Sequence, residues 1–116
     1  MSTLWLNDWE NTDISQLQRL FGITDSKLDG VELILASHHN EDDSGYAFIL
    51  YCSRHILYEI NASHDSELNL IGQWQPEETT LEALLFRLTR GNLGKNQQGD
   101  DIFASALLAV LKRYMQ

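Results

Sequence analysis

One continuous apolar segment, Tyr46–Cys52, limits the possible folds of this chain more than any other feature. A strand with one face in water alternates apolar and polar residues, whereas an unbroken apolar run is typical of a strand covered on both faces. Polar segments lie on both sides of the run, His39–Gly45 before it and Ser53-Arg54 after it. Because these connections are short, we expect the neighbouring strands to be antiparallel.

The segments around this central strand predict the rest of the architecture. Further strands are expected at Val31–His38 and Arg54–Ala62, with a short fourth strand within Leu68–Trp74. Helical spacing of apolar residues predicts one helix before the strands and two after them. We therefore predict an α+β fold, with a small antiparallel sheet of three to four strands and about three helices packed mainly on one face.

Capping residues mark the ends of the first predicted helix. Thr12 or Asp13 can cap a helix over Ile14–Phe21, because their side chains can accept hydrogen bonds from its first turn. Gly22 can end this helix, since glycine readily adopts the left-handed conformation that follows many helices.

The two later helices carry similar signals. Thr79 and Glu82 fit a capping box, and Gly91 can end the helix that they begin. Asp100 or Asp101 can cap the last helix. Its expected buried stripe consists of Phe103, Leu107, Val110, Leu111 and Tyr114.

The chain length of 116 residues predicts one domain, and a hydrophobic content of 43% suffices for one core. Residues 1–11 are expected to form an arm that docks on the core or on a partner, and residues 92–100 a mobile polar loop. No apolar stretch has the length of a membrane span, and the first residues lack the features of a signal peptide. We therefore expect a cytoplasmic protein that does not associate with membranes.

Acidic residues outnumber basic residues by 17 to 8, mostly in the first half of the chain. Residues up to Ser53 include nine acidic and two basic residues, which give −7 of the total charge of −9. Direct nucleic-acid binding by this half is disfavoured because carboxylates repel phosphates. The acidity either keeps the protein soluble or forms a surface for a basic protein partner, with Glu41, Asp42 and Asp43 as candidate contacts.

Three tryptophans, Trp5, Trp9 and Trp74, are the aromatic residues of most interest. Tryptophan commonly anchors a segment on the core. A tryptophan that stays exposed beside acidic residues instead has the character of an interface hot spot. We name all three as candidate partner contacts and leave the anchoring role open.

Histidines and carboxylates are concentrated in His38-His39-Asn40-Glu41-Asp42-Asp43, and His64-Asp65 follows the third predicted strand. In an antiparallel meander these segments share one end of the sheet, where they could hold zinc or nickel. Adjacent strand residues point to opposite faces, so only one of His38 and His39 can join His64. The alternative is an ordinary solvated loop, and we predict no metal or other cofactor. Because the sequence shows no nucleophile motif and no phosphate-binding loop, we expect no enzyme.

A family resemblance rests on Gly45–Tyr51, Leu57–His64 and Gly72–Leu84, which includes Gln73-Trp74-Gln75-Pro76-Glu77-Glu78-Thr79-Thr80. With Arg90–Gly94 and the final helix, these segments resemble a family of small bacteriophage and prophage proteins over residues 45 to about 114. The resemblance implies a mobile genetic element as the origin, and it brings no established activity. In that family Ser-His precedes a Cys-x-Cys pair. Here Asp65-Ser66-Glu67 follows, which puts any metal or redox role of those cysteines in doubt.

Together these features predict an acidic accessory module that binds another protein, such as an inhibitor of a host defence or nucleic-acid-processing complex. A second possibility is a structural or homo-oligomeric component. A third is a metal-dependent enzyme that uses His38 or His39, His64 and nearby carboxylates.

Overall fold

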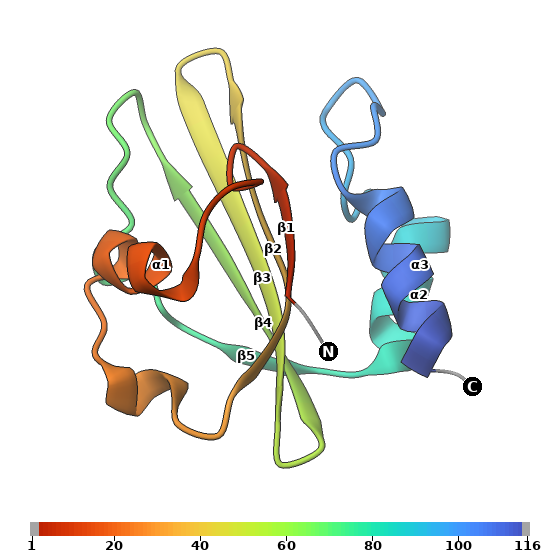
Figure 1. Ribbon diagram of the computed structural model, residues 1–116. Helices are drawn as coiled ribbons and strands as arrows, with labels where there is room; N and C mark the ends of the chain where they lie inside the picture. The colour runs from red at the N-terminus through yellow and green to blue at the C-terminus, as the bar shows by residue number, and fades with distance from the viewer. Residues whose placement is uncertain (1–2, 115–116) are drawn as a thin grey trace. The chain divides into compact units, whose positions relative to one another are not determined.

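The strands of the computed structural model form one sheet in the order β1-β2-β3-β4-β5 (Figure 1). The structure describes residues 3–114, so the first two residues of the predicted arm lie outside it. The α+β fold is confirmed, but the sheet has five strands rather than three to four. Their bounds are β1 Leu4–Asn7, β2 Glu32–Glu41, β3 Ser44–Ser53, β4 Ile56–His64 and β5 Glu77–Thr79.

The apolar run lies in β3, the central strand of the sheet. β3 is antiparallel to both of its neighbours, β2 and β4. Phe48 and Leu50 point to one face and Ile49 to the other, and all three are at most 3% exposed. The predicted central strand that is covered on both faces is therefore confirmed.

The outer strands differ from the prediction. β1 lies in the predicted arm and pairs in parallel with β2, with Leu4 opposite Leu35 and Asn7 opposite His38, so the sheet is mixed rather than antiparallel. Four residues are too few for a periodic pattern, so this strand has no clear signal. The predicted strand within Leu68–Trp74 is wrong, because this segment contains no strand. Its apolar residues belong partly to an exposed loop.

Helix α1, Ile14–Phe21, begins and ends at the predicted residues. Oδ1 of Asp13 accepts a hydrogen bond of 2.9 Å from the backbone nitrogen of Gln16, and Gly22 ends the helix at φ 68°. Leu17 and Phe21 are buried against one face of the sheet. The core there includes Leu33, Ala36, Ile49 and Ile60.

The chain forms two compact units, residues 1–78 and residues 79–116. The second contains α2, Leu81–Arg90, and α3, Ala104–Tyr114, which contact each other. The N-cap of α2 is Thr80 rather than the predicted Thr79, because Oγ1 of Thr80 accepts the hydrogen bond from Ala83.

The buried stripe of α3 follows the prediction at four of its five positions. Tyr114 is the exception, because it lies at the end of the helix and is 38% exposed. Phe103, Leu107, Val110 and Leu111 are buried. No helix among residues 3–114 is long and apolar enough to cross a membrane.

Candidate functional site

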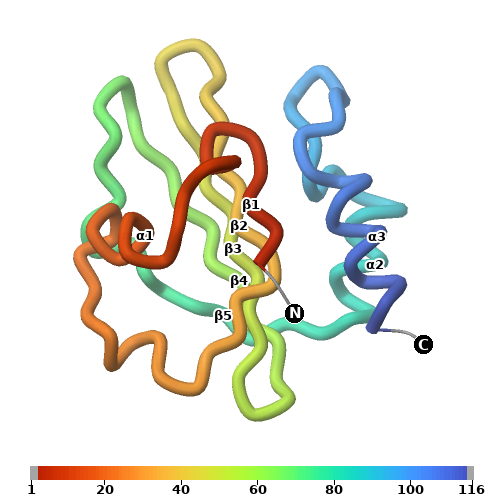
Figure 2. The backbone as a smooth tube through the Cα atoms, in the orientation of Figure 1, coloured from red at the N-terminus to blue at the C-terminus, as the bar shows by residue number. Residues whose placement is uncertain are grey.

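Three segments of the first unit meet at one end of the sheet. Figures 1 and 2 show the β2–β3 hairpin and the chain after β4 at the same end. The strand register explains this arrangement, since Gly45 is paired with Asn40 on one side and with His64 on the other. The parallel pairing of Asn7 with His38 brings the end of β1 to the same place. The expectation that His38 and His64 share one end of the sheet is confirmed.

His38 lies at the centre of this region and is 4% exposed. Its Nδ1 atom is 3.2 Å from Oδ2 of Asp8, and the same oxygen accepts a hydrogen bond of 3.1 Å from the side chain of Asn40. The backbone nitrogen of Asp8 also donates to the carbonyl oxygen of His38 over 2.8 Å. Trp9 stacks on the imidazole, with ring centroids 5.4 Å apart. The ring therefore has a fixed orientation.

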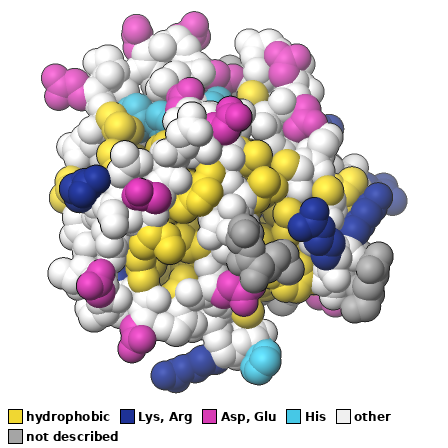
Figure 3. All heavy atoms as spheres, in the orientation of Figure 1, with side chains coloured by type: hydrophobic (Ala, Val, Ile, Leu, Met, Phe, Trp, Pro, Cys, Tyr) yellow, Lys and Arg dark blue, Asp and Glu magenta, His cyan; other side chains and the backbone are white. Residues whose placement is uncertain are grey.

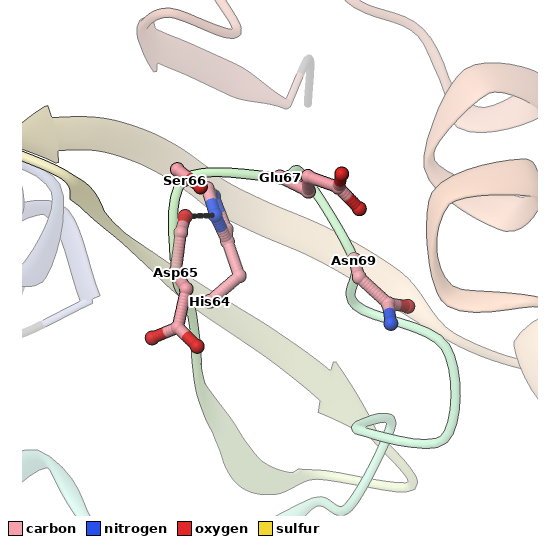
Figure 4. A pocket seen from close by; sticks show the side chains of 5 residues that line it. All are labelled: His64, Asp65, Ser66, Glu67 and Asn69. Carbon is pink, nitrogen blue, oxygen red and sulfur yellow. Dashed lines mark hydrogen bonds between the residues drawn. The ribbon is translucent and has the colours of Figure 1, made fainter.

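His64 meets His38 end to end. The two Nε2 atoms are 2.7 Å apart. The ring planes differ by only 11° and the centroids are 5.0 Å apart. This centroid separation equals the nitrogen–nitrogen distance plus about one ring radius at each end, so the rings do not lie face to face. The Nδ1 atom of His64 lies 2.6 Å from the backbone oxygen of Asp65 (Figure 4).

The surroundings of His38 favour its neutral form. Burial is the largest cause that lowers its pKa below the ordinary value of 6.5, and the nearby His64 lowers it further. The carboxylate of Asp8 raises the pKa but does not cancel these effects. The contact between His38 and Asp8 at neutral pH is therefore a hydrogen bond rather than an ion pair.

His39 does not join this pair. Its ring stacks on Tyr46, with centroids 5.5 Å apart. The prediction that only one of the two adjacent histidines can share a site with His64 is thus confirmed for His38.

The predicted acidic contacts lie at the tip of the β2–β3 hairpin. Asp42 and Asp43 form the turn of the β2–β3 hairpin and are exposed, while Glu41 is half-buried. Figure 4 shows that the carboxylates of Asp65 and Glu67 point away from the ring of His64. On the surface, acidic side chains lie around the histidines at this end of the molecule (Figure 3). Residues 3–114 contain no group of three His, Cys, Asp or Glu side chains that could hold a metal ion.

The tryptophans act mainly as anchors inside the first unit. Trp9 is 4% exposed and also makes an edge contact with Phe21 at 6.4 Å. Trp74 is half-buried, parallel to Tyr51 at 6.1 Å and edge-on to Phe21. Trp5 is half-buried in β1. Of the three, Trp9 is the one in contact with the histidine pair, and it has little surface to offer a partner.

Exposed apolar side chains adjoin this acidic end. Leu68 and Ile71, in the loop between β4 and β5, are 50% and 62% exposed. Ile71 lies against the end of α1, since a Cβ atom on Gly22 would be 2.8 Å from its Cδ1 atom. Leu68 borders a surface hollow with α1 and the segment before it. We call these parts the loop–helix surface, which consists of Trp9, Thr12, Gln16, Arg19, Leu20, Leu68 and Ile71.

Sequence reasoning missed Asp8 as the partner of His38 and Asn40 as the partner of Asp8. Asp8 is 30 residues from His38 along the chain, and only the parallel pairing of β1 brings them together. No local motif marks such a contact.

Comparison with protein-family models, with curated proteins and with solved structures found no match. The resemblance to the bacteriophage and prophage family therefore stays a prediction.

Proposed function

We propose that this chain is an acidic accessory module of phage or mobile-element type that binds a basic protein in the cytoplasm. One observation supports this function above the others. Carboxylates from three separate segments lie at one end of the sheet, and the segment with Asp65 and Glu67 continues into the exposed Leu68 and Ile71.

The charges at this end are available to a partner. Asp42, Asp43, Asp65 and Glu67 are exposed, and Asp8 contributes a fifth carboxylate at the edge of the histidine pair. Carboxylates grouped in this way produce a negative potential that speeds the approach of a positively charged surface. The same potential repels nucleic acid, so the partner is a protein.

The exposed apolar residues supply binding affinity that the charges alone do not provide. Exposed ion pairs contribute little affinity on their own, whereas burial of large apolar side chains contributes most of the energy of many interfaces. Leu68 and Ile71 are exposed apolar side chains of one loop, and the exposed Glu67 directly precedes Leu68. An apolar centre with a charged margin is the usual composition of a protein–protein interface.

The chemistry of this surface favours a particular class of partner. A positively charged site that normally receives phosphate groups offers the complement to a cluster of carboxylates. Such sites occur in nucleic-acid-processing complexes, including those of host defence. Occupation by this protein would inhibit them by excluding the nucleic acid.

A capture experiment with matched variants tests the proposal. Tagged protein is incubated with bacterial lysate at low and high salt, and bound proteins are identified by mass spectrometry. The Asp42→Asn, Asp43→Asn variant removes two charges at the acidic end. The Asp29→Asn, Glu32→Gln variant removes two charges elsewhere in the first unit. We expect a basic partner that is lost at high salt, is weakened by the first variant and is retained by the second.

A partner that both variants lose equally would show that only the net charge matters. Capture of proteins that are neither basic nor sensitive to salt would contradict the proposal.

A homo-oligomeric role is the second candidate, and a different observation favours it. Phe86 in α2 is 65% exposed. Large apolar side chains that are this exposed commonly mark contacts between chains. Light scattering across a range of protein concentrations distinguishes the two roles. An oligomer that Phe86→Ser converts to a monomer would support self-assembly, while a monomer at every concentration would exclude it.

A further inference from the structure

Each of the two facing histidines has its Nδ1 atom against an oxygen that accepts hydrogen bonds. This oxygen belongs to the carboxylate of Asp8 for His38, and to the backbone of Asp65 for His64. A carboxylate and a carbonyl group cannot donate a hydrogen bond, so both Nδ1 atoms carry hydrogen. Each neutral ring then has a lone pair on its Nε2 atom.

These two lone pairs face each other across 2.7 Å. Two acceptors at this separation repel, and a cation that both nitrogens bind removes the repulsion. The cation is either a shared proton or a metal ion. The partners of the Nδ1 atoms fit a metal ion, because metal-bound histidine almost always donates its other N–H group to a carboxylate, a backbone carbonyl or water.

We propose that His38 and His64 bind one divalent transition-metal ion of the zinc class through their Nε2 atoms. Imidazole nitrogen prefers zinc, copper and nickel to magnesium or calcium. Since no further His, Cys, Asp or Glu side chain among residues 3–114 completes a set of three, water fills the remaining positions. The site adjoins the proposed partner surface, since Asp8 and Trp9 contact His38, but metal binding through the Nε2 atoms does not require the partner.

The space around His64 fits this assignment. Gly45 lies opposite His64, and a Cβ atom on Gly45 would be 2.1 Å from Nε2 and 2.3 Å from Cε1 of that ring. The φ angle of Gly45 is outside the left-handed region, so its backbone does not require glycine. The missing side chain instead leaves space for the ring of His64, which packs over Gly45 with its Nε2 atom 2.7 Å from that of His38.

A small movement of His64 completes the geometry. Zinc–nitrogen bonds of about 2.0–2.1 Å at a tetrahedral angle place two nitrogens roughly 3.3 Å apart, so the nitrogens must separate by roughly 0.6 Å. The ring of His64 must also tilt out of its end-to-end alignment with His38, so that both lone pairs point at one ion. His38 is held by Asp8 and Trp9. His64 is half-buried at the end of β4 and borders an open hollow of about 390 Å³, which gives it freedom to move (Figure 4).

Titration of the full chain with zinc tests the site. Protein treated with a chelator and dialysed is titrated with zinc chloride, while bound zinc and the melting temperature are measured. We expect one zinc ion per chain and a melting temperature that rises with the zinc concentration. Magnesium chloride at the same concentrations should produce neither effect.

Two matched variants locate the bound ion. His64→Gln should abolish saturable zinc binding, whereas His39→Gln, one residue from His38 but on the opposite face, should retain it. Both positions are more exposed than His38, so the variants are expected to fold. In ¹⁵N spectra of the wild-type imidazoles, zinc should shift the Nε2 signals of His38 and His64 and leave His39 and His55 unchanged.

Three results would overturn the assignment. One is the absence of saturable zinc binding. Another is binding that survives in His64→Gln. The third is a spectrum in which the two Nε2 atoms share one hydrogen that zinc does not displace, which would identify the pair as a proton-binding site instead.

Discussion

Arg54 and His55 form the two-residue turn between β3 and β4, and both adopt positive φ angles, 54° and 70°. This is the sign pattern of a type I′ turn, which matches the twist of a hairpin and strongly prefers Asn-Gly. An ordinary side chain in the left-handed region costs about 1–2 kcal/mol. The turn therefore carries conformational strain that Asn-Gly would avoid.

Relief of this strain should stabilise the first unit. The Arg54→Asn, His55→Gly variant is expected to raise the free energy of unfolding by about 1–2 kcal/mol, measured by urea denaturation. Arg54→Lys is the control, because it retains the charge and the strain. Equal stability of the two variants would show that the positive φ angles cost nothing here.

Gly45→Ala should separate the two histidines. The added methyl group would occupy the position of the His64 ring, so we expect loss of the close Nε2 contact and a stability loss of about 1–3 kcal/mol. Imidazole ¹⁵N shifts and urea denaturation measure the two effects. Ser44→Ala changes the neighbouring residue of β3 and should alter neither. Unchanged imidazole signals in Gly45→Ala would contradict the role assigned to this glycine.

Trp9 should contribute more to the stability of the N-terminal segment than any other single side chain. It is buried between His38 and Phe21, so Trp9→Ala leaves a cavity and is expected to cost about 3–5 kcal/mol of unfolding free energy. Trp9→Phe retains an aromatic ring and should cost distinctly less. A cost below 1 kcal/mol for the alanine variant would mean that the segment is not held by this residue.

Asp101 should make the second unit sensitive to acid. Hydrogen bonds, first from the side chain of Ser105 and then from the backbone of α3, lower the pKa of Asp101 below its ordinary value of 3.8. A lowered pKa contributes stability at pH values above 3.8, and this contribution disappears as the pH falls through the pKa of the folded state. Asn retains an acceptor but loses the charge, and the position is exposed, so Asp101→Asn is expected to cost about 0.5 kcal/mol at neutral pH.

The pH dependence provides the check on this prediction. Thermal unfolding of both proteins between neutral pH and pH 3 should show that their difference shrinks in acid. A difference that stays constant over this range would exclude the ionised carboxylate as its cause.

Local patterns in the sequence were sufficient to predict the parts of the fold that depend on local physics. The apolar run predicts β3, and the spacing of Leu17 and Phe21 with Asp13 and Gly22 predicts α1. The predicted strand at Arg54–Ala62 corresponds to β4, whose Tyr58 and Ile60 belong to the core beside α1.

The remaining features depend on contacts between distant segments. Nothing in the sequence of β1 shows that it pairs with β2, and so nothing shows that Asp8 meets His38. The end-to-end histidine contact also needs the register of three strands. The incorrect prediction of a strand within Leu68–Trp74 also reflects contacts between distant segments. The apolar residues of this segment suggest a strand, but Leu70 is buried in the core while Leu68 and Ile71 are exposed in a loop.

The most direct test of the proposed function is the affinity of the captured partner as a function of salt concentration. Calorimetric titration of the wild type should show affinity that falls steeply with salt, and Asp42→Asn, Asp43→Asn should show a weaker affinity with a shallower dependence. The Asp29→Asn, Glu32→Gln control should match the wild type. An affinity that depends neither on salt nor on Asp42 and Asp43 would contradict the acidic end of the sheet as the binding surface.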